Sequence, residues 1–146
     1  MAVLVLDQAT KLVALEQLSP GSPVPVVDGF LSFTLVLNPG LAFGMFAIGY
    51  PRWLATLLSL GALSLLVFLA SQLLSSGGRL AALALGLIFG GAVGNLIDRG
   101  RFGAVVDFID VYWRDYHWPA FNVADSAITV GVGLLALRLL VSSRST

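Results

Sequence analysis

Cysteine is absent from this sequence of 146 residues, and histidine and lysine occur only once each. Without cysteine the chain has no disulfide framework, no thiolate nucleophile and no cysteine-based zinc site, and a lone His117 cannot build a histidine-rich metal centre. With Lys11 as its one lysine and a formal net charge of zero, the chain also lacks a basic patch for a phosphate backbone. We therefore expect no metal and no nucleic-acid partner.

Charge is scarce as well: eight basic and eight acidic side chains accompany an apolar fraction of 58% and a mean hydropathy of +0.93. A soluble domain of this length needs a more charged surface. Three stretches contain no Asp, Glu, Lys or Arg, namely residues 53–78, 80–97 and 126–137. They approach the ~20 apolar residues that cross a bilayer, so the composition predicts a membrane protein.

The sequence predicts an all-α membrane protein with four transmembrane helices, forming a single membrane-embedded domain over residues 1–146. The predicted spans are about 2–18, 53–74, 80–97 and 123–141. The first span is atypical because it contains Asp7, Lys11 and Glu16. It has neither the basic start nor the small-residue cleavage site of a cleavable signal peptide.

Two segments between the predicted spans differ from the rest. Residues 24–46 combine strand-forming Val and Phe with the turn signals Asp28-Gly29 and Pro39-Gly40, which predicts a small extracytoplasmic β-rich segment because an open sheet cannot face lipid. Residues 99–123 are polar and aromatic, as in a loop at the headgroup level. Four spans would place both segments on the side opposite the termini. Arginines divide three against four between the two sides, so charge bias assigns no orientation.

The third span carries glycines at positions 86, 90, 91 and 94. Small residues at this spacing let transmembrane helices approach closely, so the pattern indicates tight helix packing.

Ionisable groups at membrane depth are costly, so each needs either a partner or a function. Asp7 and Lys11 lie four residues apart on one helical face, which suits mutual neutralisation as well as substrate positioning. Asp98 lies where the third span ends and opposes the negative end of the helix dipole. Arg99 and Arg101 are nearby candidates for an ion pair with it.

Asp107 and Asp125 are the candidates for chemistry. Asp107 lies in the apolar stretch Val105–Ile109, either as a strand residue facing water or as a buried acid. Asp125 follows Asn122 at the spacing of a capping box at the start of the fourth span. Both segments return to the same membrane face, so the two carboxylates could meet. Two acids in a poorly solvated site share a proton, which is the chemistry of aspartic proteases. Asp110 and Asp115 are weaker candidates.

Five blocks together resemble one family, the lipoprotein signal peptidases, also called signal peptidase II. They are Leu6–Lys11, Asn38–Gly44, Gly90–Arg99, Val105–Ile109 and Phe121–Asp125, in the family's order and over nearly the whole chain. Members usually have a longer stretch before the first block, so we expect the first span to be truncated or its start codon misassigned.

The resemblance implies a multi-pass endopeptidase of the bacterial cytoplasmic (inner) membrane, with its active site toward the periplasm or outer face. Such enzymes remove the signal peptide from a prolipoprotein before a diacylglyceryl-modified cysteine, using two aspartates and no metal or organic cofactor. The resemblance further implies membrane lipid as a partner, the antibiotic globomycin as an inhibitor, and action as a monomer.

Carried over residue by residue, the resemblance implies Asp107 and Asp125 as the catalytic pair. The positions that match residues for substrate binding or site shaping are Asp7, Lys11, Asn38, Asn95, Asp98, Arg99, Asn122 and Ala124.

Two other classes of function remain open on the residues alone. In a small transporter or channel subunit, Asp7, Lys11 and Asp98 would line a polar path at mid-depth. A non-catalytic assembly factor held together by the glycine-rich helix would not need Asp107 and Asp125 to converge. The separation of these two acids therefore discriminates between the readings.

Overall fold

The structure is a computed structural model that describes residues 1–40, 51–74 and 78–142. Its helices are α1 (Ala2–Gln17), α2 (Arg52–Leu74), α3 (Gly78–Phe102) and α4 (Val123–Ser142). Its strands are β1 (Val24–Val27), β2 (Leu31–Asn38), β3 (Val105–Trp113) and β4 (Tyr116–His117).

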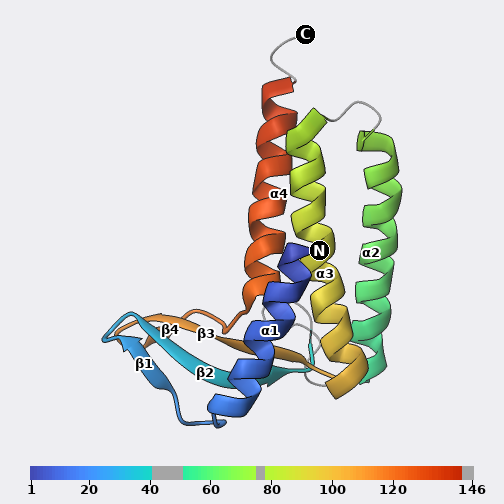
Figure 1. The fold of residues 1–146 in the computed structure, drawn as a ribbon. Coiled ribbons are helices and arrows are strands. Elements are labelled where there is room, and N and C mark those ends of the chain that lie inside the picture. Colours follow the sequence, from blue (N-terminus) through green and yellow to red (C-terminus); the bar gives the residue numbers. More distant parts are fainter. Residues whose placement is uncertain (41–50, 75–77, 143–146) are drawn as a thin grey trace.

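Helix α3 is the centre of the helical part. It packs against α1, α2 and α4, and α1 also contacts α4. Figure 1 shows α2, α3 and α4 side by side, while α1 begins about halfway along them and runs toward the sheet. The sequence of α3 suits this central place because small residues line the faces that meet its neighbours.

The four strands form one antiparallel sheet in the order β1-β2-β3-β4. The Asp28-Gly29 turn joins β1 to β2, and Gly29 adopts a positive φ of 76° that glycine accommodates without strain. The pairing of β2 with β3 places Val36 opposite Asp107 and Asn38 opposite Val105. The inner strand β3 therefore brings Asp107 beside the end of β2.

The sheet lies at one end of the helices, where the chain leaves α3 and enters α4 (Figure 1). Gly103 ends α3 with a φ of 68°, and its N–H donates to the Arg99 carbonyl at 3.0 Å. The chain passes directly into β3 and returns through Phe121, whose carbonyl accepts from the N–H groups of Phe108 and Ile109. This return places the start of α4 against the middle of β3.

The prediction of an all-α protein with four transmembrane helices is wrong. Helices do occupy nearly the predicted ranges, but a four-stranded sheet makes up a substantial part of the fold. In the described part of the chain, only Gly78–Phe102 is both long and apolar enough to cross a membrane, and Trp53–Leu66 is a shorter apolar stretch. The 16 residues of α1 rise only ~24 Å, against a ~30 Å hydrocarbon core, and bury Asp7 and Lys11.

The sheet was predicted less completely than the helices. The polar and aromatic residues of 99–123 indicate an interfacial loop, whereas 105–113 form an inner strand whose acids find partners among neighbouring side chains. The β-rich segment predicted for 24–46 forms β1 and β2, and residues 41–46 lie outside the described residues.

Glycines of α3 decide how closely it approaches α4 and α1. A Cβ added to Gly91 would lie 2.5 Å from the Ala124 carbonyl oxygen and 2.8 Å from Cγ1 of Ile128. A Cβ added to Gly94 would collide with the carboxylate of Asp7. The predicted tight packing of this helix is confirmed at these positions, whereas an added Cβ at Gly86 would meet nothing within 4 Å.

We expect Gly91→Ala to destabilise the fold by ~1–3 kcal/mol, because the backbone of α4 cannot yield to the added methyl group. Gly86→Ala is the matched control on the same helix and should leave stability unchanged or raise it slightly through helix propensity. Thermal unfolding of both purified variants in detergent measures the difference. Equal melting temperatures for the two variants would refute the close α3–α4 contact.

Candidate active site

Asp107 lies in β3 and is almost completely buried, with 2% of its surface exposed. Its Oδ2 accepts a hydrogen bond from Asn38 Nδ2 at 3.1 Å, and its Oδ1 accepts one from Asn122 Nδ2 at 2.7 Å. The alternative in which this acid faces water is therefore wrong. Two amide groups from separate segments instead fix the orientation of the carboxylate.

Asp125 lies in the first turn of α4 and forms the predicted capping box. The backbone N–H of Asp125 donates to Asn122 Oδ1 at 2.9 Å, and the backbone N–H of Asn122 donates to Asp125 Oδ2 at 3.3 Å. The second carboxylate oxygen, Oδ1, accepts from Asn95 Nδ2 at 2.8 Å. The capping reading is confirmed, and the same carboxylate also faces α3.

Asn122 brings the two acids together. Its side-chain carbonyl is occupied by the Asp125 N–H, so its amide nitrogen points the other way and donates to Asp107. The same nitrogen donates to the Val106 carbonyl at 3.2 Å and to Asn95 Oδ1 at 3.3 Å. Asn122 has no exposed surface, so its amide is a fixed link between the Asp107 carboxylate and the backbone of Asp125, while its own backbone N–H holds the Asp125 carboxylate.

The electrostatics of Asp107 follow from this setting. Burial, and then the nearby charge of Asp125, raise the pKa of Asp107 from 3.8 to about 7. The hydrogen bonds donated by Asn38 and Asn122 act in the opposite direction because they favour the charged form. Asp107 can therefore hold a proton near neutral pH.

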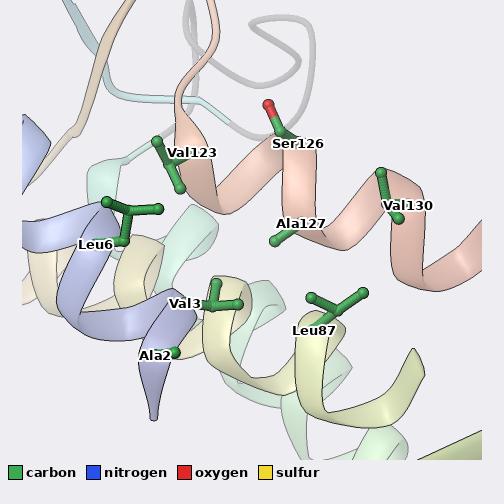
Figure 2. A pocket seen from close by; sticks show the side chains of 8 residues that line it. All are labelled: Ala2, Val3, Leu6, Leu87, Val123, Ser126, Ala127 and Val130. Atoms are coloured by element: carbon green, nitrogen blue, oxygen red, sulfur yellow. The ribbon is translucent and has the colours of Figure 1, made fainter. Parts of the chain in front are cut away.

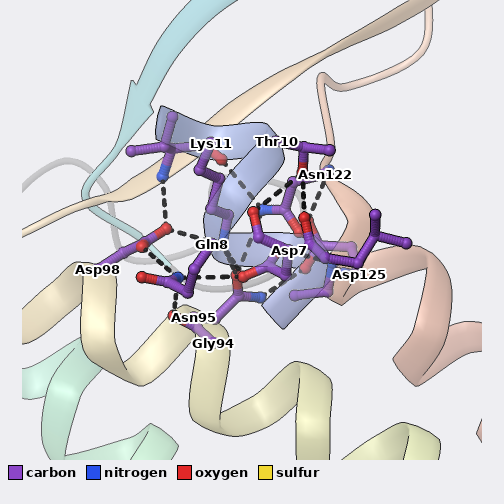
Figure 3. Close-up of polar contacts among 12 residues, drawn as sticks. Asp7, Gln8, Thr10, Lys11, Gly94, Asn95, Asp98, Asn122 and Asp125 are labelled. Atoms are coloured by element: carbon purple, nitrogen blue, oxygen red, sulfur yellow. Dashed lines mark hydrogen bonds and ion pairs between the residues drawn. The ribbon is translucent and has the colours of Figure 1, made fainter. Parts of the chain in front are cut away.

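A buried charged cluster supports the two acids from α1 and α3 (Figure 3). Lys11 Nζ lies 2.9 Å from Asp7 Oδ2 and 2.7 Å from Asp98 Oδ2, and all three side chains are 2% exposed or less. The predicted pairing of Asp7 with Lys11 is confirmed. Among the contacts of the described residues, the partner of Asp98 is Lys11, from another helix, and neither Arg99 nor Arg101 forms an ion pair with it.

The charged cluster also binds the backbone next to each of the two acids, Asp107 and Asp125. Asp7 Oδ1 accepts from the N–H of Ala124 at 2.9 Å, at the positive end of the α4 dipole. Asp98 Oδ2 accepts from the N–H of Val106 at 3.1 Å. Ala124 therefore contributes its backbone N–H, not its side chain, to the site. Ala124 immediately precedes Asp125, and Val106 immediately precedes Asp107.

Arg99 secures the end of β2. Its Nη2 donates to the Gly40 carbonyl at 2.7 Å and its Nη1 to the Asn95 carbonyl at 3.3 Å. The N–H of Gly40 donates to Asn38 Oδ1 at 3.0 Å. Arg99 and Asn38 therefore hold one short segment from both sides, which aims the Asn38 amide nitrogen at Asp107.

Gln8 is the residue that sequence reasoning missed. Its amide nitrogen donates to Asp98 Oδ1 at 3.0 Å and lies 3.2 Å from both Asp7 Oδ2 and the Gly94 carbonyl. It therefore joins α1 to α3 inside the charged cluster. Gln8 directly follows Asp7 in the block Leu6–Lys11, and this position was the feature of the sequence that could have identified it.

The two weaker acids do not join this site. Asp110 accepts from the Ser32 hydroxyl at 3.0 Å and lies 2.9 Å from His117 Nδ1, which makes it a brace across β2, β3 and β4. Asp115 is exposed in the turn after β3.

An apolar pocket of about 440 Å³ lies beside the start of α4, between α1 and α3 (Figure 2). Its one polar lining side chain, Ser126, already donates to the Asn122 carbonyl at 3.0 Å. The pocket therefore carries no chemistry of its own. Across the described residues, no three or more His, Cys, Asp or Glu side chains are placed to hold a metal ion.

Comparison with known proteins identifies the family of this chain. The family described as Signal peptidase (SPase) II matches residues 1–141. The lipoprotein signal peptidase of Geobacter sulfurreducens is 49% identical over 142 residues, which cover 97% of this chain and 88% of the relative. That of Symbiobacterium thermophilum is 43% identical over 145 residues, covering 99% and 93%.

Solved structures extend the likeness to the fold. One described as a bacterial membrane enzyme structure at 2.3 Å resolution has a TM-score of 0.84 at 30% identity, covering 99% of this chain and 86% of that one. A second bacterial membrane enzyme structure, at 1.9 Å resolution, has a TM-score of 0.78 at 33% identity, covering 94% and 87%. The chain therefore belongs to the signal peptidase II family of bacterial membrane proteases.

Proposed function

We propose that this protein is an aspartic endopeptidase that removes the signal peptide from diacylglyceryl-modified prolipoproteins, cutting before the modified cysteine. Asp107 and Asp125 are the catalytic pair. The observation that carries the proposal is Asn122, whose side-chain nitrogen donates to the Asp107 carboxylate and whose backbone N–H donates to the Asp125 carboxylate. Membership of the family supplies the substrate class.

The two acids have different roles in this proposal. Asp107, with a pKa of about 7, holds the shared proton, and Asp125 acts as the base. A water molecule gives its proton to Asp125 and attacks the scissile carbonyl carbon, while Asp107 protonates the carbonyl oxygen. Collapse of the resulting diol breaks the C–N bond: Asp125 gives its proton to the leaving nitrogen and Asp107 takes a proton from a diol hydroxyl, which leaves a carboxylic acid product and restores both aspartates.

Amide donors hold both carboxylates of the pair. Asn95 donates to Asp125 from α3, on the side where Lys11 lies, and Asn38 donates to Asp107 from β2. Each carboxylate is thus held by side chains that cannot themselves accept the proton from water. The oxygens remain in fixed positions while the proton moves.

Substrate access follows from the position of the site. The acids lie where the sheet meets the helices, and we propose that this end faces the periplasm or outer face of the bacterial cytoplasmic membrane (Figure 1). The signal helix enters sideways from the lipid, and its diacylglyceryl chains remain in the bilayer against the β-rich segment. Lipid is then part of the recognition, globomycin competes for the site, and one copy of the chain suffices.

The competing readings fit less well. The assembly-factor reading does not require Asp107 and Asp125 to share a partner, yet both bind Asn122. A transporter path needs polar groups left open to a solute, whereas the Lys11 ammonium is fully engaged with protein acceptors.

We expect Asp107→Asn and Asp125→Asn each to lower turnover by at least ~10²-fold, because each change removes a proton donor or acceptor while keeping side-chain size. The double variant should be barely slower than either single one, because the two acids act as a unit. Cleavage of a diacylated prolipoprotein, followed by mass, measures the rates. The exposed Asp115→Asn is the control and should keep wild-type turnover. Cleavage at the wild-type rate by Asp107→Asn or by Asp125→Asn would show that the two aspartates are not a catalytic pair.

The pH dependence of turnover should carry the signature of Asp107. Because the acid must be protonated and its pKa is about 7, activity should fall as pH rises through about 7. Asn38→Ala removes a hydrogen bond that lowers this pKa, so the alkaline limb should move to higher pH. A pH–rate profile of both proteins makes the measurement. An alkaline limb that stays in place, or moves down, in Asn38→Ala would contradict the assignment of the proton to Asp107.

Recognition of lipid predicts a strong preference between two substrates with the same sequence. The prolipoprotein carrying the diacylglyceryl group should be cleaved, and the unmodified form should be cleaved at least ~10-fold more slowly at equal concentration, since its cysteine is not held at the bilayer surface. Parallel time courses in one detergent or lipid mixture provide the comparison. Equal rates would argue against lipid recognition while leaving the aspartate pair untouched.

A further inference from the structure

The ammonium group of Lys11 has three hydrogens and can only donate. The described residues give it three acceptors: Asp98 Oδ2 at 2.7 Å, Asp7 Oδ2 at 2.9 Å and Asn95 Oδ1 at 2.9 Å. With 2% of its surface exposed, Lys11 makes these bonds away from bulk water. Two of its N–H groups point at the carboxylates of Asp7 and Asp98, and the third points at the neutral amide of Asn95.

That third contact fixes which way the Asn95 amide is turned. An asparagine amide has two ends of similar shape, one a donor and the other an acceptor. Because Lys11 cannot accept, the Asn95 oxygen must face it, and Asn122 Nδ2 donates to the same oxygen at 3.3 Å. The Asn95 nitrogen is thereby directed at Asp125 Oδ1, 2.8 Å away. The reverse orientation would put the Asn95 oxygen against a carboxylate and two N–H donors against an ammonium.

We propose that Lys11 is a positioning residue for the reaction: it orients the Asn95 amide so that Asn95 holds the Asp125 carboxylate ready to take a proton from water. The proposal rests on the proposed function of the aspartate pair and deepens it. Among the described contacts Lys11 reaches Asp125 through Asn95 (Figure 3), and its positive charge also acts through space to favour the ionised forms of Asp107 and Asp125.

A purely structural role would look different. Lys11 also joins α1 to α3 through Asp7 and Asp98, and removing an ammonium from between two buried carboxylates is destabilising whatever it does for catalysis. The test must therefore give the double variant the same net charge as the wild-type cluster and must separate turnover from stability.

The test uses the full-length protein and a diacylated prolipoprotein. Lys11→Met/Asp98→Asn removes one positive and one negative charge together, and its parent for comparison is Asp98→Asn, which retains the Lys11–Asn95 contact. We expect kcat to fall at least ~10-fold from the parent to the double variant. KM should stay within about twofold of the parent value, and the melting temperature should stay within about 3 °C of it. Thr10→Val is the control on the same helix, because the Thr10 hydroxyl donates only to carbonyls of its own helix, and it should keep wild-type kcat. An unchanged kcat in Lys11→Met/Asp98→Asn would overturn the proposal.

A second variant leaves Lys11 in place and covers the case in which the double variant does not fold. Asn95→Asp keeps the shape and an oxygen for Lys11 but presents no N–H to Asp125. We expect it to lose at least ~10-fold in kcat and to remain folded. Wild-type kcat in Asn95→Asp would overturn the proposal, because the direction of that amide would then be irrelevant.

These outcomes are distinct from a failure of the proposed function. If Asp107→Asn or Asp125→Asn cleaves at the wild-type rate, the aspartate mechanism itself fails. If those variants are inactive while both Lys11→Met/Asp98→Asn and Asn95→Asp keep their kcat, only the role of Lys11 is refuted.

Discussion

The site depends on one buried ammonium group. Lys11 lies between the carboxylates of Asp7 and Asp98, and without it two negative charges would be confined together where water cannot reach them. With it in place, both carboxylates also accept from the backbone: Asp7 through its second oxygen from Ala124, and Asp98 from Val106 through the same Oδ2 that pairs with Lys11. One charge thus allows two helices to fix the two segments that carry the proposed catalytic acids.

This arrangement requires the backbones of α1, α3 and α4 to come unusually close. At Gly94 the Asp7 carboxylate occupies the space that a methyl group would take, and at Gly91 the start of α4 does so. The glycines of α3 therefore have two effects: they permit helix packing, and they let a carboxylate from α1 reach the N-terminus of α4. A larger residue at either position would separate the charged cluster from the acids that it supports.

Contacts set by local spacing were predicted with their partners, whereas the partner of Asp98 on a distant helix was not. The Asp7–Lys11 spacing of four and the Asn122–Asp125 spacing of three each specify a contact through helix geometry alone. Nothing local specifies that Asp98 pairs with Lys11, because these residues meet only when α3 packs against α1. For the same reason Arg99 and Arg101, its neighbours in sequence, were the wrong expectation for an ion pair.

The sheet shows the same limit. Residues 105–113 contain enough strand formers for β3, but the sequence left open whether Asp107 faces water or is buried, since the Asn38 amide that satisfies it lies 69 residues away in the chain. The four-span prediction failed in a related way. Asp7 and Lys11 were expected both to lie in a membrane span and to shape the site, whereas the 16-residue helix α1 that carries them is too short for a ~30 Å hydrocarbon core.

The central claim is that this polar cluster makes a protease that cuts beside a lipid-modified cysteine. The most direct measurement is to incubate the purified protein with a diacylglyceryl-modified prolipoprotein and to determine the masses of both products. The account predicts a released signal peptide and a lipoprotein that begins with the modified cysteine. A substrate that remains intact, or a cut at any other bond, would contradict it.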